Sequence, residues 1–286
     1  MERVMHDGDS SKWSSRGATF LLLTYGLAVL LYGAALLAAP GWTTVVEAGT
    51  SSEFVSHLNQ SRAGSVLGLA VLALIAAISA RPAFASRDIF AALALTNLLM
   101  AMILGLTQMT PMAAPERWLA VAVCFFWAIG FALVGARAAA APAEAPHHDT
   151  LLKAAVVTYA IFTGIEGLAW LLAPGLLGQM MITQFGGATP YAGLVRGAVD
   201  LPIAIIAWNW RGRIGLPSGL ALTAALVMAN LVLAGAGLLA QLHTIATPSR
   251  WAVEGLHIVW FGAFAWALVQ PLLSGGSKPA FAPSVH

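Results

Sequence analysis

Several charged or polar side chains interrupt the apolar stretches in the C-terminal half of this chain. They are Glu166, Arg196, Asp200, Asn230, Arg250, Glu254 and His257. A charged side chain in a membrane-spanning helix costs about 2.5–3.5 kcal/mol on insertion scales, so a group of them in one half of a chain indicates a site. We therefore expect these residues to form an intramembrane polar site.

Reversible protonation coupled to ligand binding is the first chemistry that this set allows. Carboxylates and an imidazole accept protons, and the ordinary pKa of histidine lies near neutrality. Arg196 or Arg250 could then hold an anionic headgroup or a carboxylate of the ligand. This interpretation predicts a pocket that binds or transports a small molecule or a membrane lipid.

Metal chemistry is an alternative for the same residues. Glu254 and His257 have the i,i+3 spacing that di-iron carboxylate bundles use, but those bundles need two such pairs and further glutamates. Glu166 and Asp200 could supply oxygen ligands for a single metal. A metal-dependent membrane enzyme therefore stays open, with no catalytic residue, metal ligand or cofactor assigned.

A structural role is the third hypothesis. Arg196 and Asp200 are spaced i,i+4, as are Arg250 and Glu254, so each acid could neutralise an arginine of its own helix. The chain would then be a structural or accessory subunit with a membrane-protein partner. That hypothesis leaves Glu166 and His257 without a role.

The composition places these residues in a membrane. Of 286 residues, 59% are hydrophobic and only 9% are charged, against about 25% charged in soluble globular domains. The net charge of +2 and the lack of a phosphate-binding glycine loop argue against a nucleic-acid partner. The single cysteine, Cys124, rules out an internal disulfide and a CxxC pair.

Eight stretches are long and apolar enough to cross the hydrocarbon core, which takes about 20 residues. They cover approximately residues 18–39, 62–80, 88–109, 117–136, 152–173, 191–210, 218–240 and 250–270. The predicted fold is an all-α integral membrane protein with eight transmembrane helices. Pro40 and Pro174 are predicted to stop the first and the fifth helix.

The two halves of the chain repeat each other. Pro40 aligns with Pro174, and Arg62 aligns with Arg196; after one deletion, Arg117 aligns with Arg250. An even number of helices in each half makes the repeats parallel. The predicted parts are a tail (1–17), a four-helix repeat (18–137), an Ala/Pro-rich linker (138–151), a second four-helix repeat (152–271) and a tail (272–286).

The repeats differ where chemistry is expected. Repeat one has Tyr32, Val66, Val121 and Cys124 where repeat two has Glu166, Asp200, Glu254 and His257. Repeat one therefore reads as a scaffold, with Gly64 and Gly68 spaced for close helix packing. Repeat two carries the candidate site, in the outer half of the bilayer.

The distribution of lysine and arginine sets the orientation. One side has Arg3, Lys12, Arg16, Arg81, Arg87, Arg137, Lys153, Arg211, Arg213 and Lys278; the other has Arg62, Arg117, Arg196 and Arg250. The excess predicts cytoplasmic N- and C-termini in a bacterial inner membrane. The four outward arginines should anchor at the interface, hold the loops after Pro40 and Pro174, or bind an anionic group. Trp208 and Trp210 should mark the inner interface.

Four-helix units in which an arginine opens the second helix, as Arg62 and Arg196 are predicted to do, resemble the DoxX-like small bacterial membrane proteins. The resemblance is one of architecture. No motif extends it to a function, and no family is assigned from it.

Overall fold

The computed structural model describes residues 7–41, 53–79, 86–111, 113–115, 117–138, 149–181 and 189–273. Its regular elements are helical throughout these ranges, in agreement with the predicted all-α fold. They are α1 (Asp7–Ala38), α3 (Glu53–Ile78), α4 (Arg87–Thr107), α5 (Arg117–Arg137), α6 (Thr150–Leu172), α7 (Pro174–Met181), α8 (Thr189–Asn209), a 3-10 turn (Pro217–Gly219), α9 (Leu220–Leu242) and α10 (Arg250–Leu273).

Eight of the described helices are long and apolar enough to cross a membrane, which is the architecture of a polytopic integral membrane protein. The short α7 is the exception. The predicted helix stops are confirmed, because α1 ends at Ala38 and α6 at Leu172. Pro174 then opens α7, a first-turn position where proline is tolerated since no N–H is needed there.

The predicted start of the second span was wrong. α3 begins at Glu53 rather than at residue 62, so Arg62 lies well inside the helix instead of opening it. Arg196 likewise lies inside α8, which begins at Thr189. Hydropathy missed the first turns of α3 because they carry polar residues such as Asn59, which is buried at the helix interface rather than facing lipid.

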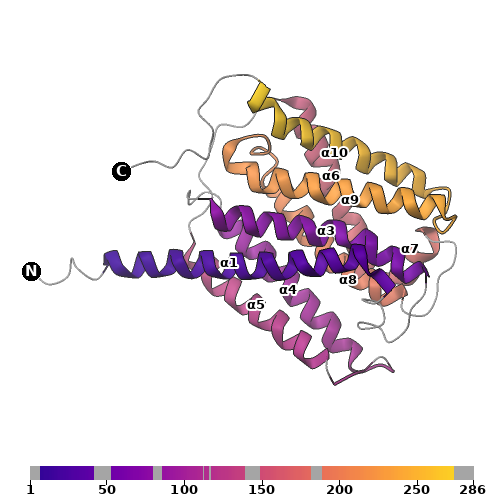
Figure 1. Ribbon diagram of the computed structural model, residues 1–286, viewed down its shortest axis with the longest axis horizontal. Helices are drawn as coiled ribbons and strands as arrows, with labels where there is room; N and C mark the ends of the chain where they lie inside the picture. Colours follow the sequence, from indigo (N-terminus) through magenta and orange to yellow (C-terminus); the bar gives the residue numbers. More distant parts are fainter. Residues whose placement is uncertain are drawn as a thin grey trace, which may run out of the picture.

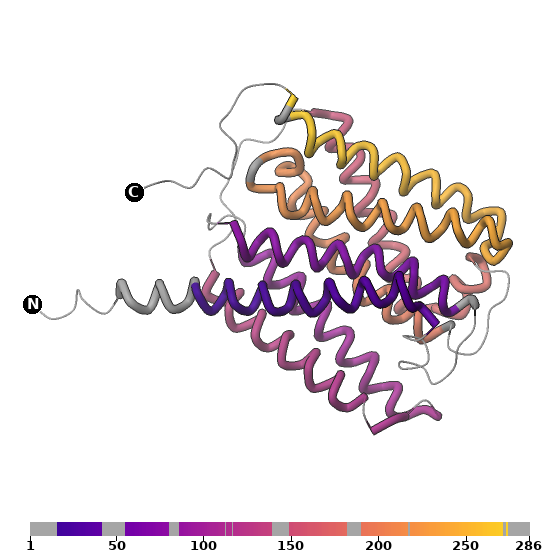
Figure 2. Tube along the Cα trace, viewed as in Figure 1, coloured from indigo at the N-terminus to yellow at the C-terminus, as the bar shows by residue number. Residues whose placement is uncertain are grey.

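Of the eight long helices that the structure describes, α3, α4, α8 and α9 form the interior of the bundle, and α1, α5, α6 and α10 lie outside. α3 packs along α1 on one side and along α9 on the other, α9 packs on α10, α6 packs on α8, and α4 packs on both α5 and α8. Figure 2 shows the traces of α1, α3, α9 and α10 running side by side. The apolar window of α3 is 78% buried and that of α5 only 22% buried, so the outer helices present their surfaces to lipid.

Glycines allow the interior helices to approach each other closely. A Cβ at Gly64 would lie 2.8 Å from the Ala229 carbonyl oxygen of α9, and one at Gly68 would lie 3.0 Å from that of Ala225. The close packing predicted for these two glycines is therefore confirmed. Spaced small residues of this kind let helix backbones meet in membranes.

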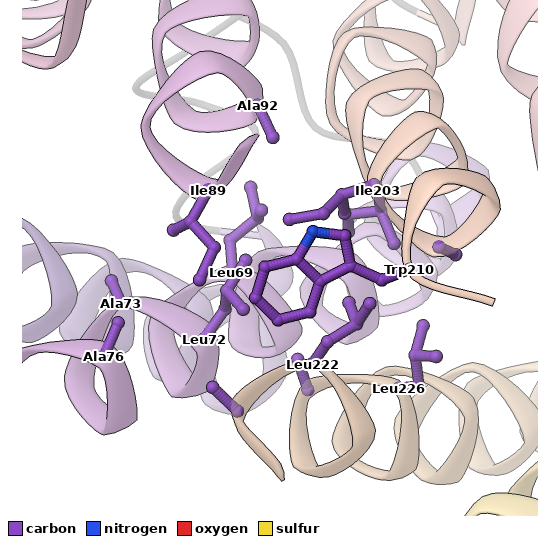
Figure 3. Close-up of a cluster of buried hydrophobic side chains, with 14 of the residues drawn as sticks. Leu69, Leu72, Ala73, Ala76, Ile89, Ala92, Ile203, Trp210, Leu222 and Leu226 are labelled. Carbon is purple, nitrogen blue, oxygen red and sulfur yellow. The ribbon is translucent and has the colours of Figure 1, made fainter. Parts of the chain in front are cut away.

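Trp210 does not mark a membrane interface as predicted. Figure 3 shows its indole among Leu69, Leu72 and other apolar side chains of the core, and it is 0% exposed. Its Nε1 donates a hydrogen bond of 2.9 Å to Asp88 Oδ2 at the start of α4. Trp208, two residues earlier, is 44% exposed, since successive positions on a helix point in different directions.

Replacing Gly64 should separate α3 from α9. We expect Gly64→Ala to lower the free energy of unfolding by about 1–3 kcal/mol, because the added methyl meets the Ala229 carbonyl oxygen, a backbone atom that does not rotate aside, as well as Leu233 Cγ. Gly105→Ala is the matched control, since a Cβ there meets no described atom within 4 Å. Thermal unfolding in detergent measures both, and a Gly64→Ala protein as stable as Gly105→Ala would contradict the close approach.

Candidate functional site

The predicted polar residues come together where α6, α8, α9 and α10 meet. α6 supplies Glu166, α8 supplies Arg196 and Asp200, α9 supplies Asn230, and α10 supplies Arg250, Glu254 and His257. All seven side chains are buried. Five of them form one connected set of ion pairs, which we call the ionic network: Glu166, Arg196, Asp200, Arg250 and Glu254.

Arg196 is the most fully engaged member of the ionic network. Its Nη2 lies 2.8 Å from Glu166 Oε1, an ion pair whose angles fall outside those of a hydrogen bond. Its Nε donates a hydrogen bond of 3.1 Å to Asp200 Oδ2 on the same helix. Its Nη1 donates one of 2.9 Å to Ser61 Oγ on α3. Three different groups thus hold one guanidinium in place.

Arg250 joins the network from the other side. Its Nε donates to Glu254 Oε1 on the same helix, and its Nη1 lies 3.6 Å from Glu166 Oε1. Both predicted i,i+4 pairs are therefore present. They are not isolated pairs, however, because Glu166 Oε1 contacts both arginines and links α8 to α10 through α6.

The first half of the chain contributes two residues that the sequence analysis missed. Ser61 on α3 accepts from Arg196, and Ser65, one turn later, donates to Asp200 Oδ1. These serines have the same i,i+4 spacing as the pair they meet. That match was the available signal, but serines in a helix often bond only to their own backbone, so spacing alone did not single them out.

Anchoring at the membrane interface, one of the roles predicted for the four outward arginines, is wrong because all four side chains are buried. Arg62 is 0% exposed, Arg196 2%, Arg250 5% and Arg117 8%. Arg62 has its own partner on α1, because its Nη2 donates a hydrogen bond of 2.5 Å to Tyr32 Oη. Snorkelling to headgroups requires an exposed guanidinium, so these side chains serve the interior of the bundle.

Asn230 fixes how His257 is protonated. The amide Nδ2 of Asn230 donates a hydrogen bond of 2.8 Å to the Leu226 carbonyl, so its Oδ1 faces His257. That oxygen lies 2.9 Å from His257 Nδ1, which must then be the nitrogen that carries the hydrogen. In the neutral ring, Nε2 is left with a lone pair.

Two buried polar atoms of α10 lack a hydrogen-bond partner among the described residues. They are Glu254 Oε2 and His257 Nε2, one helical turn apart in sequence. Gly237 on α9 gives the Glu254 carboxyl its place, because a Cβ at residue 237 would overlap that carboxyl group. Unsatisfied buried atoms of this kind are rare in folded proteins and call for an explanation, such as a proton or a water.

A small cavity adjoins the ionic network at the end of the bundle that carries α7 and the turn between α9 and α10. Its volume is about 40 Å³, room for two or three water molecules. Its lining residues are His57, Leu58, Ser61, Trp170, Met181, Arg196, Ala236, Gly237, Ala240, Ile245, Ala246 and Arg250. The polar groups in this lining include two network arginines and the serine that Arg196 contacts.

The arrangement does not form a set of converging metal ligands. Within the part of the chain that the structure describes, no group of three or more His, Cys, Asp or Glu side chains is placed to hold a metal ion. The guanidinium groups of Arg196 and Arg250 lie between the carboxylates that the metal hypothesis would combine. One ring nitrogen of His257, Nδ1, bonds to Asn230 and is therefore not free to bind a metal.

Removing one arginine from the ionic network should be costly. We expect Arg196→Gln to lower the free energy of unfolding by about 3–5 kcal/mol, because Glu166 and Asp200 would remain buried without their counter-charge. Arg211→Gln is the control, since Arg211 is exposed in the turn that follows α8. Thermal unfolding followed by tryptophan fluorescence measures both, and equal melting temperatures would show that the network adds no stability.

Comparisons with known proteins leave the function to be argued from this geometry. No family model matches the chain, and neither a curated protein nor a solved structure is significantly similar to it.

Proposed function

We propose that the chain binds or transports a small molecule or a lipid at the ionic network, with coupled proton uptake. The observation that carries this proposal is the charge of the network. Arg196 and Arg250 supply two positive charges, whereas Glu166, Asp200 and Glu254 supply three negative ones when ionised. A buried excess charge is expensive in a membrane protein, so the network favours uptake of a proton.

The cavity supports access to the network from one end of the bundle. Arg196, Arg250 and Ser61 line it, so water that enters it reaches the polar groups without crossing the apolar core. Its size suits water or a single small polar group such as a carboxylate. We propose that the polar end of the ligand enters here, while the rest of the ligand stays outside the bundle.

Proton uptake also offers a way to bind an anionic ligand group. Each arginine is already held by carboxylates, so an anion must displace one of them. Arg250 is the easier to release from Glu166, because its Nη1 lies 3.6 Å from Oε1 whereas Arg196 Nη2 lies 2.8 Å away. Protonation of a network acid would weaken its attraction for Arg250, which would then pair with the ligand.

Helix pairing supports the proposed origin from two parallel four-helix repeats. In the alignment α1, α3, α4 and α5 correspond to α6, α8, α9 and α10. Within the repeats, α1 packs on α3 just as α6 packs on α8, and α4 packs on α5 just as α9 packs on α10. Between the repeats, α3 packs on α9 and its counterpart α8 packs on α4. The contact between Arg62 and Tyr32 corresponds to the contact between Arg196 and Glu166. We propose that an ancestral arginine contact was kept in both repeats and acquired acids in the second.

The orientation is part of the proposal. α1 begins and α10 ends at the same end of the bundle, as expected for termini on one side of a membrane (Figure 1). The lysine and arginine excess would place that side in the cytoplasm, and we propose the bacterial inner membrane. The cavity then faces the outer side.

A structural role is the second candidate. The two i,i+4 pairs satisfy much of the network within α8 and α10, which favours an accessory subunit whose polar groups only fix helix register and whose partner is another membrane protein. The unpartnered atoms of Glu254 and His257 favour the binding site over this role, since a purely structural network gains from satisfying every buried polar atom.

Glu166 should be essential for ligand retention. We expect native mass spectrometry to find a bound small molecule or lipid on the wild-type protein, and Glu166→Gln to weaken its binding at least about tenfold, equivalent to about 1.4 kcal/mol. Glu166 links both arginines, so its loss changes the charge and the geometry of the network together.

Tyr32→Phe is the matched control for this experiment. Tyr32 aligns with Glu166 and contacts Arg62 in the same way, but it lies outside the ionic network. The ligand should stay bound to Tyr32→Phe, and the wild-type protein in liposomes should take up protons when the external pH is lowered. A wild-type protein with no bound ligand and no proton uptake would favour the structural role.

A further inference from the structure

We infer that Glu254 carries the exchangeable proton of the ionic network, on its Oε2 atom beside Gly237. This inference rests on the proposed function and names the group through which proton coupling acts. It follows from comparing how each of the three network acids is surrounded.

Asp200 and Glu166 each have more stabilising contacts than Glu254 has. Asp200 accepts hydrogen bonds on both oxygens, from Ser65 at Oδ1 and from Arg196 at Oδ2. Glu166 Oε1 lies near two guanidinium groups, those of Arg196 and Arg250. Donors and positive charge favour the ionised form of a carboxyl group, so a proton gains least at these two residues.

Glu254 pairs with a single arginine and, within the described ranges, leaves its second oxygen without a donor. Its Oε1 accepts from Arg250, but its Oε2 has no hydrogen-bond partner among the described residues, and the residue is 0% exposed. An ionised carboxylate would leave negative charge on a buried oxygen without a donor, which is costly. A proton on Oε2 removes that charge and makes the network neutral.

Gly237 borders both the cavity and this carboxyl group. Gly237 lines the cavity, and the Glu254 carboxyl fills the space that any side chain at residue 237 would need. The inferred route passes this glycine: water in the cavity relays a proton from outside the protein to Oε2, and relays it back on release. No bond other than O–H forms or breaks in this step.

The groups that face Glu254 are consistent with one proton. Arg250 lies on its own helix, Glu166 faces it from α6 and Arg196 from α8, whereas the part of α9 beside it presents Gly237 and no titratable group. His257 on the next turn bonds Asn230 through Nδ1. With that hydrogen on Nδ1 the neutral ring keeps its lone pair on Nε2, and a proton on Glu254 then balances the network by itself.

Infrared spectroscopy tests this inference directly. A buried protonated carboxyl gives a C=O stretch that shifts in D2O, whereas exposed carboxylates are ionised near pH 7 and give none. We expect one such band in the wild-type protein in liposomes at pH 7, its loss in Glu254→Gln, and its unshifted retention in His257→Gln and in Ser65→Ala, which removes a donor to Asp200 but no charge. A band that shifts in Ser65→Ala would place the proton on Asp200 and overturn the inference, as would a wild-type protein without the band.

A pair of glycine variants gives a second test that leaves Glu254 in place. Gly237→Ala should displace the carboxyl group and shift or abolish the band, whereas Gly235→Ala should leave it unchanged, because a Cβ at Gly235 meets no described atom within 4 Å. An unchanged band in Gly237→Ala would contradict the placement of the proton beside this glycine. A Glu254 band in a protein that binds no ligand would support the inference and contradict the proposed function. The experiment therefore distinguishes failure of the inference from failure of the proposed function.

Discussion

Two arginines contact a single oxygen of Glu166, and this shared contact joins the charged residues of three helices into one site. Without Glu166, the pairs Arg196–Asp200 and Arg250–Glu254 would be local features of two separate helices. With it, α6, α8 and α10 share one set of charges, and a change of protonation at any acid alters the balance for both arginines. The coupling is electrostatic, and burial strengthens it because little water screens the charges from one another.

Close helix approach is what makes this sharing possible. Glycines bring α3 against α9 and leave the Glu254 carboxyl its space beside Gly237. In the same way, a Cβ at Gly197 on α8 would lie 2.6 Å from the Gly167 carbonyl of α6, next to Glu166. The charged residues and the small residues therefore act together, since a bulkier interface would hold the carboxylates too far from the arginines.

Much of this arrangement could be predicted from the sequence. Hydropathy located the eight spans, and the comparison between the two halves picked out the acids that the structure brings together. The serines Ser61 and Ser65 escaped because a one-dimensional pattern does not tell which helices of different halves meet. The place of Trp210 and the start of α3 were predicted wrongly for a related reason. Polarity along one helix does not show which of its side chains the neighbouring helices cover, and burial depends on those neighbours.

The serines of α3 also bear on how the protein is made. Ser61 and Ser65 are synthesised long before Arg196 and Asp200, the residues they contact, and α10 follows later still. When the early helices enter the membrane, Ser61 and Ser65 of α3 therefore do not yet have their partners on α8. The ionic network is complete only after α10 has been inserted. A chain truncated between α8 and α10 keeps Glu166 and Arg196 but lacks Arg250, so the buried Glu166 carboxylate loses one of its two counter-charges.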